Sequence, residues 1–327
     1  MNILITGCAG FIGFHLVKKL LSKKNKIYGI DNCNNFYNNG LKQERLKILN
    51  KISINKKYYF KFFKFDISSK KKIDNFFKKF KIDIVIHLAA QAGVRFSISK
   101  PELYLKSNIG GYLNILEAAK KNKINKIIYA SSSSVYGNNK KKPFSEKDVC
   151  ENPLQFYAVT KLTNEYMSKV YAYLYNIKFI GLRFFTVYGP YGRPDMALFK
   201  FTKNIINNKN IHFFSSGSIK RDFTYIDDVI VRIEGLIKKF KNIKTNHEIF
   251  NIGNGKPEKL ELFLKEIEKN LKKKARLKKF KEKKEDSLVT FSDSKKIDSF
   301  LKLSKKTNLK KGIRLFINWY KAFYNKN

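Results

Sequence analysis

Three glycines spaced three residues apart directly follow the first apolar run of this 327-residue chain. The run, residues 2–6, is typical of a strand, and a helical pattern begins within the turn Gly7-Cys8-Ala9-Gly10-Phe11-Ile12-Gly13. In such a unit one glycine permits the tight turn, one lets the backbone approach a pyrophosphate, and one allows close helix–strand packing. The helix then presents its unpaired N–H groups to the phosphates. Although the spacing is not Gly-x-Gly-x-x-Gly, this position predicts a dinucleotide site contacted by Gly7, Gly10, Phe11, Ile12 and Gly13.

Apolar runs and helical patterns alternate through the first half of the chain. Further strands are expected at residues 27–30, 58–65, 83–88, 126–130 and 179–185, and helices at residues 73–80, 112–121 and 156–174. This alternation predicts an α/β fold with a Rossmann-type, doubly wound parallel sheet. Later elements are shorter and mixed, up to a closing helix at residues 314–324. We therefore expect a cofactor-binding domain over residues 1–189 and a smaller mixed α/β substrate domain over residues 190–327, with some exchange of chain between them.

The net charge of +42 combines 68 basic with 26 acidic residues. One interpretation is binding to nucleic acid or to an anionic membrane surface. However, only eight of the 68 are Arg, which leaves 60 Lys, whereas a surface that reads phosphate would more often use Arg. Asn, Ile, Phe and Tyr are also abundant, as AT-rich codons would dictate. We therefore expect Lys to be a solvated surface residue, residues 269–284 to be a solvated face or loop, and no nucleic-acid partner.

The location of the protein is constrained by three further absences in the sequence. No apolar stretch approaches the about 18 residues of a membrane span. The N-terminal apolar run has no basic residues before it, unlike a signal peptide. Three Cys and four His show no paired spacing, so neither a disulfide framework nor a metal site is expected. We expect a cytoplasmic protein that is not inserted in a membrane.

Acidic residues at the ends of two predicted strands indicate which dinucleotide is bound. Asp31 lies 24 residues after Gly7, where a carboxylate accepts hydrogen bonds from the adenosine ribose and would repel a 2′-phosphate. This favours NAD over NADP. Asp66 ends the third strand and is expected to face the adenine. Other predicted cofactor contacts at strand ends are Asn32, Ile67, Leu88, Ala89, Ala90 and Ser131.

A tyrosine and a lysine form the predicted catalytic centre. Tyr157 and Lys161 are four residues apart and share one helix face. They follow the serine run 131–134, which ends a predicted parallel strand, and ligands bind at the carboxyl ends of such strands. Tyr has an ordinary pKa of about 10, but a neighbouring ammonium and the nicotinamide ring would favour the phenolate. Tyr157 is then the general base, Ser132 shares its proton, and both Tyr157 and Lys161 also contact the cofactor.

At this point the sequence resembles a known family, the extended short-chain dehydrogenase/reductases that act as nucleotide-sugar epimerases and dehydratases. Five motifs occur in order over residues 1–255: Ile5-Thr6-Gly7-x-x-Gly-x-x-Gly13, His87-Leu88-Ala89-Ala90, Ser131-Ser132-x-x-Val135-Tyr136-Gly137, Tyr157-x-x-x-Lys161 and Arg221-Asp222-Phe223-Thr224-Tyr225-Ile226-Asp227-Asp228. Within the family the chain most resembles UDP-glucuronate 4-epimerases, on the strength of residues 91–95 and 182–197.

The resemblance implies a set of substrate-binding residues. Ser133, Ser134 and Thr186 would hold the sugar carboxylate. Arg193 and Arg221 would hold the sugar and diphosphate, and Arg95 is a further candidate for the same cleft. In a chain that otherwise uses Lys, Arg183 either grips a ligand or has a structural role within its strand. The family's Pro-Gly-Asp-like turn, whose Asp contacts the uridine ribose, is replaced by Lys284-Glu285-Asp286-Ser287, in which Asp286 is the candidate equivalent.

The residues after Ser132 also bear on the type of reaction. Related dehydratases carry Asp-Glu where this chain has Ser133 and Ser134, and decarboxylases often carry Glu at the second position. Elimination therefore lacks its proton donor, which favours epimerisation of UDP-glucuronate to UDP-galacturonate for surface polysaccharide synthesis. In this scheme Tyr157 takes the C4 hydroxyl proton while hydride passes to NAD, and a 4-keto sugar turns over before reduction.

Two other functions are compatible with the sequence. One is a 4-epimerase or decarboxylase that acts on another UDP-sugar. The other is a catalytically silent dinucleotide-binding protein that binds RNA, against which the intact Ser132, Tyr157 and Lys161 argue. The resemblance also implies a homodimer through two helices per subunit, and the apolar faces of residues 112–119 and 166–174 permit it.

Overall fold

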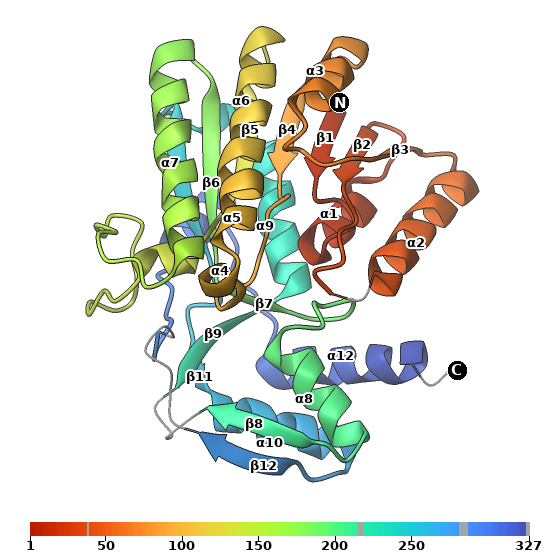
Figure 1. The fold of residues 1–327 in the computed structure, drawn as a ribbon, viewed down its shortest axis with the longest axis vertical. Helices are drawn as coiled ribbons and strands as arrows, with labels where there is room; N and C mark the ends of the chain where they lie inside the picture. Colours follow the sequence, from red (N-terminus) through yellow and green to blue (C-terminus); the bar gives the residue numbers. More distant parts are fainter. Residues whose placement is uncertain (38, 215–218, 281–286, 325–327) are drawn as a thin grey trace.

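The computed structural model describes residues 1–37, 39–214, 219–280 and 287–324. Its main feature is a seven-stranded parallel sheet, which occupies the upper half of Figure 1. The strands are β1 (Asn2–Thr6), β2 (Lys26–Asp31), β3 (Tyr59–Lys64), β4 (Ile84–His87), β5 (Lys126–Ser132), β6 (Lys178–Phe184) and β10 (His247–Ile252). Their order is β3-β2-β1-β4-β5-β6-β10. Successive strands are therefore added on one side of β1 up to β3 and on its other side from β4 onward, so the strand order reverses between β1 and β4. The predicted doubly wound α/β fold is confirmed.

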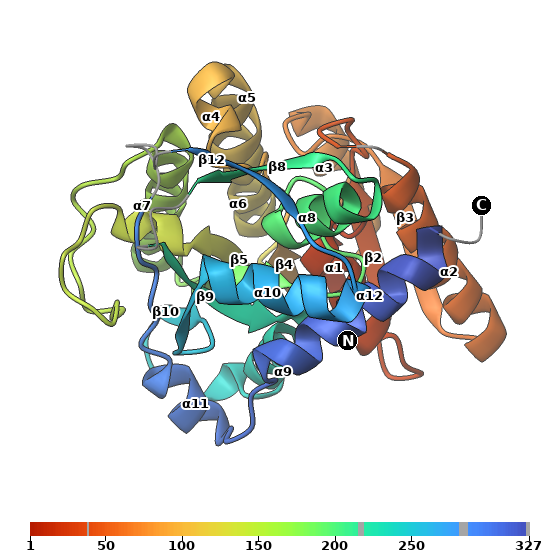
Figure 2. The same cartoon turned by 90° about the horizontal axis from the view of Figure 1, so that it is seen from below.

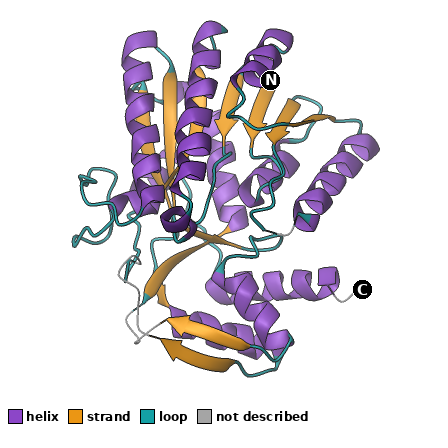
Figure 3. Cartoon of the chain, in the orientation of Figure 1, coloured by secondary structure: helices purple, strands orange, loops and turns teal. Residues whose placement is uncertain are grey.

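Helices cover both faces of this sheet (Figure 3). One face packs on α1 (Phe11–Leu20), α2 (Gly40–Lys56) and α9 (Ile226–Lys238), and the other on α3 (Lys70–Lys79), α6 (Gly111–Lys121) and α7 (Phe156–Tyr175). In β1, Ile3 and Ile5 belong to the first core and Leu4 to the second. Because side chains alternate along a strand, a strand buried on both faces must be apolar at successive positions, as the three central residues of this one are.

A second layer lies below the carboxyl ends of the strands. A three-stranded sheet contains β7 (Thr186–Tyr188), β9 (Lys220–Tyr225) and β11 (Pro257–Lys259), and a two-stranded sheet pairs β8 (Asn210–Phe214) with β12 (Arg276–Phe280). The helices of this layer are α8 (Ala197–Ile206), α10 (Leu260–Leu271) and α12 (Leu309–Tyr324), and α10 and α12 pack together on its underside (Figure 2). β10 joins the large sheet although its residues follow the small-sheet strands β7 to β9. The domain division at residue 190 stays a prediction.

Two short helices and a π-helical turn connect β4 to α6. They are α4 (Phe96–Ser99), α5 (Pro101–Tyr104) and η1 (Leu105–Gly110), while η2 (Ser133–Tyr136) follows β5 and α11 (Lys295–Leu301) precedes α12. No helix within the described residues is both long and apolar enough to cross a membrane.

The Lys-rich region differs from its expectation in one respect. Residues 276–280 form the strand β12, whereas the charge run predicted only a solvated face or loop. Arg276 to Lys279 are exposed, so the face is solvated as expected, and the backbone pairs in parallel with β8. Charged residues on an edge strand discourage pairing with another chain. The closing helix begins at Leu309, five residues before the predicted start.

Candidate functional site

The glycine-rich turn joins β1 to α1 at the point where the strand order reverses. Gly7 has φ of +72°, and a Cβ there would lie 2.7 Å from the backbone N of Ala89. A Cβ on Gly13 would collide with the carbonyl oxygen of Gly7. Gly10 precedes α1, and no side chain caps the helix N-terminus. A side chain at any of the three glycine positions would collide with the backbone of the site. Because the first N–H groups of α1 are also free of side-chain caps, the turn suits a pyrophosphate.

The carboxylates predicted to contact adenosine lie at the ends of adjacent strands. Asp31 ends β2 and accepts hydrogen bonds from the backbone N–H of Ala9 at 3.1 Å and of Cys33 at 2.8 Å. It therefore holds the glycine-rich turn against β2, and each oxygen keeps a further lone pair. Asp66 accepts from the Asn32 side chain at 2.7 Å and from the Ser68 backbone at 2.8 Å. Burial opposes ionisation of Asp66, but these hydrogen bonds lower its pKa below the ordinary value.

The segment after β4 is tied to β1 by a buried threonine and histidine. The Thr6 hydroxyl lies 2.9 Å from Nδ1 of His87 and accepts a hydrogen bond from the Ala89 N–H at 3.2 Å. Burial, with a smaller effect of Lys161, lowers the pKa of His87 to about 3, so the ring is neutral. Leu88, Ala89 and Ala90 are half-buried beside the glycine-rich turn. Among the residues described, no group of His, Cys, Asp and Glu side chains could hold a metal ion.

Sequence reasoning missed Arg45, which is fully buried on α2. Its Nη1 donates to the carbonyl oxygen of Ala9 at 2.8 Å and to the Tyr37 hydroxyl at 2.8 Å, and its Nη2 donates to the carbonyl oxygen of Tyr191 at 2.6 Å. The side chain thereby joins the glycine-rich turn to the segment that follows β7. In a chain with 60 Lys, the choice of Arg at this position was the signal that could have found it.

Tyr157 lies in the first turn of α7, near three of the predicted site residues. Burial raises its pKa above the ordinary value, while the Arg193 guanidinium and a hydrogen bond with Ser132 oppose that rise. Nζ of Lys161 lies 6.0 Å from the centre of the Tyr157 ring. The structure thus brings together Tyr157, Ser132, Lys161 and Arg193. Arg193, which the resemblance assigned to substrate binding, is thus also a cation that opposes the rise in the pKa of Tyr157.

Lys161 is almost fully buried one turn further along α7. Its Nζ donates a hydrogen bond to the carbonyl oxygen of Ala130 at 2.9 Å. Burial lowers the pKa of Lys161 to about 8 because a charged ammonium is poorly solvated there. Lys161 is therefore still mostly protonated at neutral pH but loses its proton only slightly above it.

The serine run divides between two roles. Ser132 accepts a hydrogen bond from the Ser134 N–H at 3.2 Å and donates to its hydroxyl at 3.2 Å, as β5 turns into η2. Ser133, Ser134 and Thr186 are half-buried. Ser131 instead points to α7, where its hydroxyl donates to Oε1 of Glu165 at 2.5 Å. The predicted cofactor contact of Ser131 therefore has its hydroxyl already engaged within the protein.

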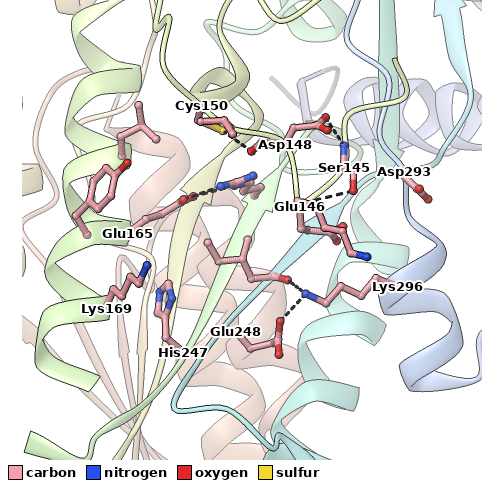
Figure 4. A pocket seen from close by; sticks show the side chains of 16 residues that line it. Ser145, Glu146, Asp148, Cys150, Glu165, Lys169, His247, Glu248, Asp293 and Lys296 are labelled. Carbon is pink, nitrogen blue, oxygen red and sulfur yellow. Dashed lines mark hydrogen bonds and ion pairs between the residues drawn. The ribbon is translucent and has the colours of Figure 1, made fainter. Parts of the chain in front are cut away.

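Arg183 has the structural role that the sequence left open. It forms two hydrogen bonds with the Glu165 carboxylate, at 2.9 and 2.8 Å, and both side chains are buried. The pair lines a cavity of about 760 Å³ on the outer side of α7 and β10, shown in Figure 4. Ser132, Tyr157 and Lys161 are not in the lining of this cavity. Arg183 is thus held inside the protein and is removed from the set of candidate ligand-binding arginines.

The remaining predicted substrate residues lie in different surroundings. Arg193 forms hydrogen bonds at 3.0 and 2.5 Å with Asp195, and its guanidinium carbon is 5.8 Å from the centre of the Phe36 ring. Arg221 lies on β9 and donates to the carbonyl oxygens of Lys220 and Leu288 at 3.1 and 3.0 Å. Arg95 is exposed just before α4. Asp286 lies outside the described residues.

Comparison with known proteins now assigns the family. Residues 3–253 match the NAD dependent epimerase/dehydratase family. The chain belongs to this family. It is 48% identical over 322 residues to an uncharacterized protein of Methanocaldococcus jannaschii, covering 98% of this chain and 96% of that one. It is 36% identical over 342 residues to UDP-glucuronate 4-epimerase 4 of Arabidopsis thaliana, covering 99% of this chain and 76% of that one.

The fold of the chain is similar to that of a solved structure over nearly its whole length. The crystal structure of UDP-glucuronic acid 4-epimerase from Bacillus cereus, in complex with UDP-glucuronic acid and NAD, superimposes with a TM-score of 0.90 at 34% identity. The match covers 99% of this chain and 100% of that one. Family membership confirms the resemblance seen in the motifs and makes NAD the cofactor. The residues of the glycine-rich turn, together with Asp31 and Asp66, fit that cofactor on their own geometry.

Proposed function

We propose that this protein interconverts UDP-glucuronate and UDP-galacturonate by NAD-dependent 4-epimerisation through a transient 4-keto sugar, in the cytoplasm and for surface polysaccharide synthesis. The observation that carries the proposal is the cluster of Tyr157, Ser132 and Arg193 at the carboxyl end of β5, next to half-buried hydroxyls and without an acid at positions 133 and 134. The similarity to UDP-glucuronate 4-epimerases supports the choice of substrate.

Tyr157 is the group that moves the proton of the C4 hydroxyl. Its hydroxyl interacts with Ser132, which can bond to the substrate oxygen and share the proton. Arg193 favours the phenolate form, and Lys161 supplies a second cation 6.0 Å from the ring. Bound NAD supplies the hydride acceptor and donor. Because the same phenol must take the proton and return it, Tyr157 acts as both base and acid in one turnover.

The hydroxyl-bearing residues decide between epimerisation and loss of carbon dioxide. Ser133, Ser134 and Thr186 can donate hydrogen bonds to a sugar carboxylate without giving it a proton. A carboxylate held by these hydrogen bonds keeps a fixed orientation while the 4-keto sugar is present. A decarboxylase or an epimerase of another UDP-sugar is the alternative, and the products distinguish them. Arg193, Arg221 and Arg95 are the proposed contacts of the sugar and diphosphate, with Asp286 as the proposed contact of the uridine ribose.

We further propose a homodimer formed by α6 and α7, which pack together on one face of the sheet. Large apolar side chains are exposed on these helices: Leu113, Tyr166, Val170, Tyr173 and Leu174, with Tyr173 88% exposed. A contiguous apolar face of this kind marks an interaction surface. Sedimentation should give twice the chain mass for the wild type and the chain mass for a Val170→Asp/Tyr173→Asp variant. A monomeric wild type would contradict the dimer.

The experiment that tests the proposed reaction compares two tyrosines of the same helix. Tyr157→Phe should lower the rate of UDP-galacturonate formation about 10²- to 10⁴-fold, as expected for loss of a positioned acid–base group. Tyr175→Phe, at the exposed C-terminal end of α7, is the matched control and should retain the wild-type rate. A Tyr157→Phe variant that keeps the wild-type rate would remove Tyr157 from the mechanism.

A further inference from the structure

Glu165 lies on the same face of α7 as Tyr157 and Lys161, at successive intervals of four residues. Its carboxylate accepts three hydrogen bonds from two strands. Oε1 accepts from the Ser131 hydroxyl of β5 at 2.5 Å and from Nε of Arg183 on β6 at 2.9 Å. Oε2 accepts from Nη2 of Arg183 at 2.8 Å. One side chain of α7 is thereby fixed to the ends of two neighbouring strands.

Burial makes this arrangement rigid. Ser131, Glu165 and Arg183 are 2%, 6% and 4% exposed, so little water competes for their hydrogen bonds. The guanidinium carbon of Arg183 also lies 4.7 Å from the centre of the Tyr136 ring in η2. Figure 4 shows Glu165 reaching from α7 toward the neighbouring strands. Charge-assisted, bidentate pairs of this kind hold a defined geometry.

The position of Ser131 connects this arrangement to the reacting groups. Ser131 is bonded to Ser132, and the residue before it, Ala130, accepts the hydrogen bond of Lys161. α7 is therefore attached to β5 at both of the residues that directly precede Ser132. Tyr157 and Ser132 meet only when α7 and the end of β5 keep this register. No role of Glu165 in binding substrate or cofactor is needed for this effect.

We propose that Glu165 is a positioning residue, which acts through Ser131 and Arg183 to hold Tyr157 and Lys161 against Ser132. The proposal rests on the proposed function for its substrate, UDP-glucuronate. It predicts that loosening the contact lowers turnover and leaves cofactor and substrate binding unchanged. A purely structural pair would instead lower stability without a selective effect on kcat.

Two buried serines of similar surroundings allow a matched test. Ser131→Ala removes the hydroxyl that bonds to Glu165. Ser168→Ala, further along α7, removes a fully buried hydroxyl that lies 2.7 Å from the Tyr112 hydroxyl of α6. Ser131→Ala should lower kcat about 10- to 100-fold with KM and bound NAD unchanged, because small misplacements of reacting groups have effects of this size. Ser168→Ala should keep kcat and KM at wild-type values.

A double-mutant comparison separates this role from a direct contact of Ser131 with NAD. Methionine at position 165 has a similar size and removes the acceptor oxygens, so Glu165→Met and Glu165→Met/Ser131→Ala should have the same kcat if Ser131 acts through Glu165. Where the Met variants do not fold, the Ser131→Ala and Ser168→Ala pair decides alone. Equal kcat for Ser131→Ala and wild type, or equal losses in both serine variants, would overturn the proposal.

Hydrogen exchange provides a readout that needs no substrate. Ser131→Ala should speed amide exchange in residues 132–136 and 157–161, while Ser168→Ala should leave these residues unchanged. If the wild type does not convert UDP-glucuronate, the proposed function fails, and this exchange pattern still tests the positioning of α7. Unchanged exchange in both segments of Ser131→Ala would contradict it.

Discussion

Arg45 is the residue whose replacement tests most sharply how the cofactor loop is held. It is fully buried and donates three hydrogen bonds, to the carbonyl oxygens of Ala9 and Tyr191 and to the Tyr37 hydroxyl. In Arg45→Lys a single ammonium replaces the fork and cannot span both carbonyls. If two of the three bonds are lost at about 1.5 kcal/mol each, the lower end for charged donors, the free energy of unfolding falls by about 3 kcal/mol.

Such a loss is measurable by urea unfolding of the NAD-free protein, because total stabilities are about 5–15 kcal/mol. Arg314→Lys is the matched control, since Arg314 is exposed on α12, and it should change stability by less than about 0.5 kcal/mol. Arg45→Lys should also lose NAD faster, because Ala9 belongs to the glycine-rich turn. Equal stability and equal NAD retention in the two variants would refute this account of Arg45.

Three further predictions address the cofactor, the lysine and the sugar carboxylate. Asp31→Asn should weaken NAD about tenfold, through loss of a charge-assisted hydrogen bond of about 1.5 kcal/mol, and leave NADP less disfavoured, as titration of the NAD-free protein would measure; wild-type affinity for NADP equal to that for NAD would contradict the role of Asp31. Burial lowers the pKa of Lys161 from 10.5 to about 8, so the folded protein releases this proton at a lower pH than the unfolded chain does. Between pH 8 and 10.5 the free energy of unfolding of the wild type should therefore rise relative to that of Lys161→Met, by up to about 3 kcal/mol. Parallel plots of unfolding free energy against pH for the two proteins would be inconsistent with that burial. Thr186→Val should increase release of carbon dioxide and UDP-pentose from UDP-glucuronate. A product mixture without UDP-pentose would count against a carboxylate contact at Thr186.

The cofactor half of the site is the part that local sequence patterns could predict. The glycine-rich turn, Asp31 and the pair Tyr157 and Lys161 each lie at a fixed offset from a strand or on one helix face. Such offsets are dictated by backbone geometry, so they are visible without knowledge of distant contacts. The parallel sheet was likewise predictable from the alternation of strand and helix patterns along the chain.

Other features depend on residues far apart in the chain. Arg45 bonds to Tyr191, 146 residues away, and no local pattern announces that contact. β12 was not predicted because its exposed lysines do not alternate with apolar residues, as they would in a strand with one buried face. Glu165 is different, because its spacing from Lys161 is visible in the sequence and predicts the same helix face, although no motif singled it out. What the sequence could not supply was its partner, since Arg183 had an equally plausible ligand role until the two strands were placed side by side.

The most direct test of the proposed reaction is proton NMR of the purified protein with UDP-glucuronate and no added NAD. UDP-galacturonate signals should grow, because hydride is returned to the sugar and NAD stays bound. Accumulation of a UDP-pentose in place of UDP-galacturonate, or unchanged UDP-glucuronate even after NAD is added, would contradict it.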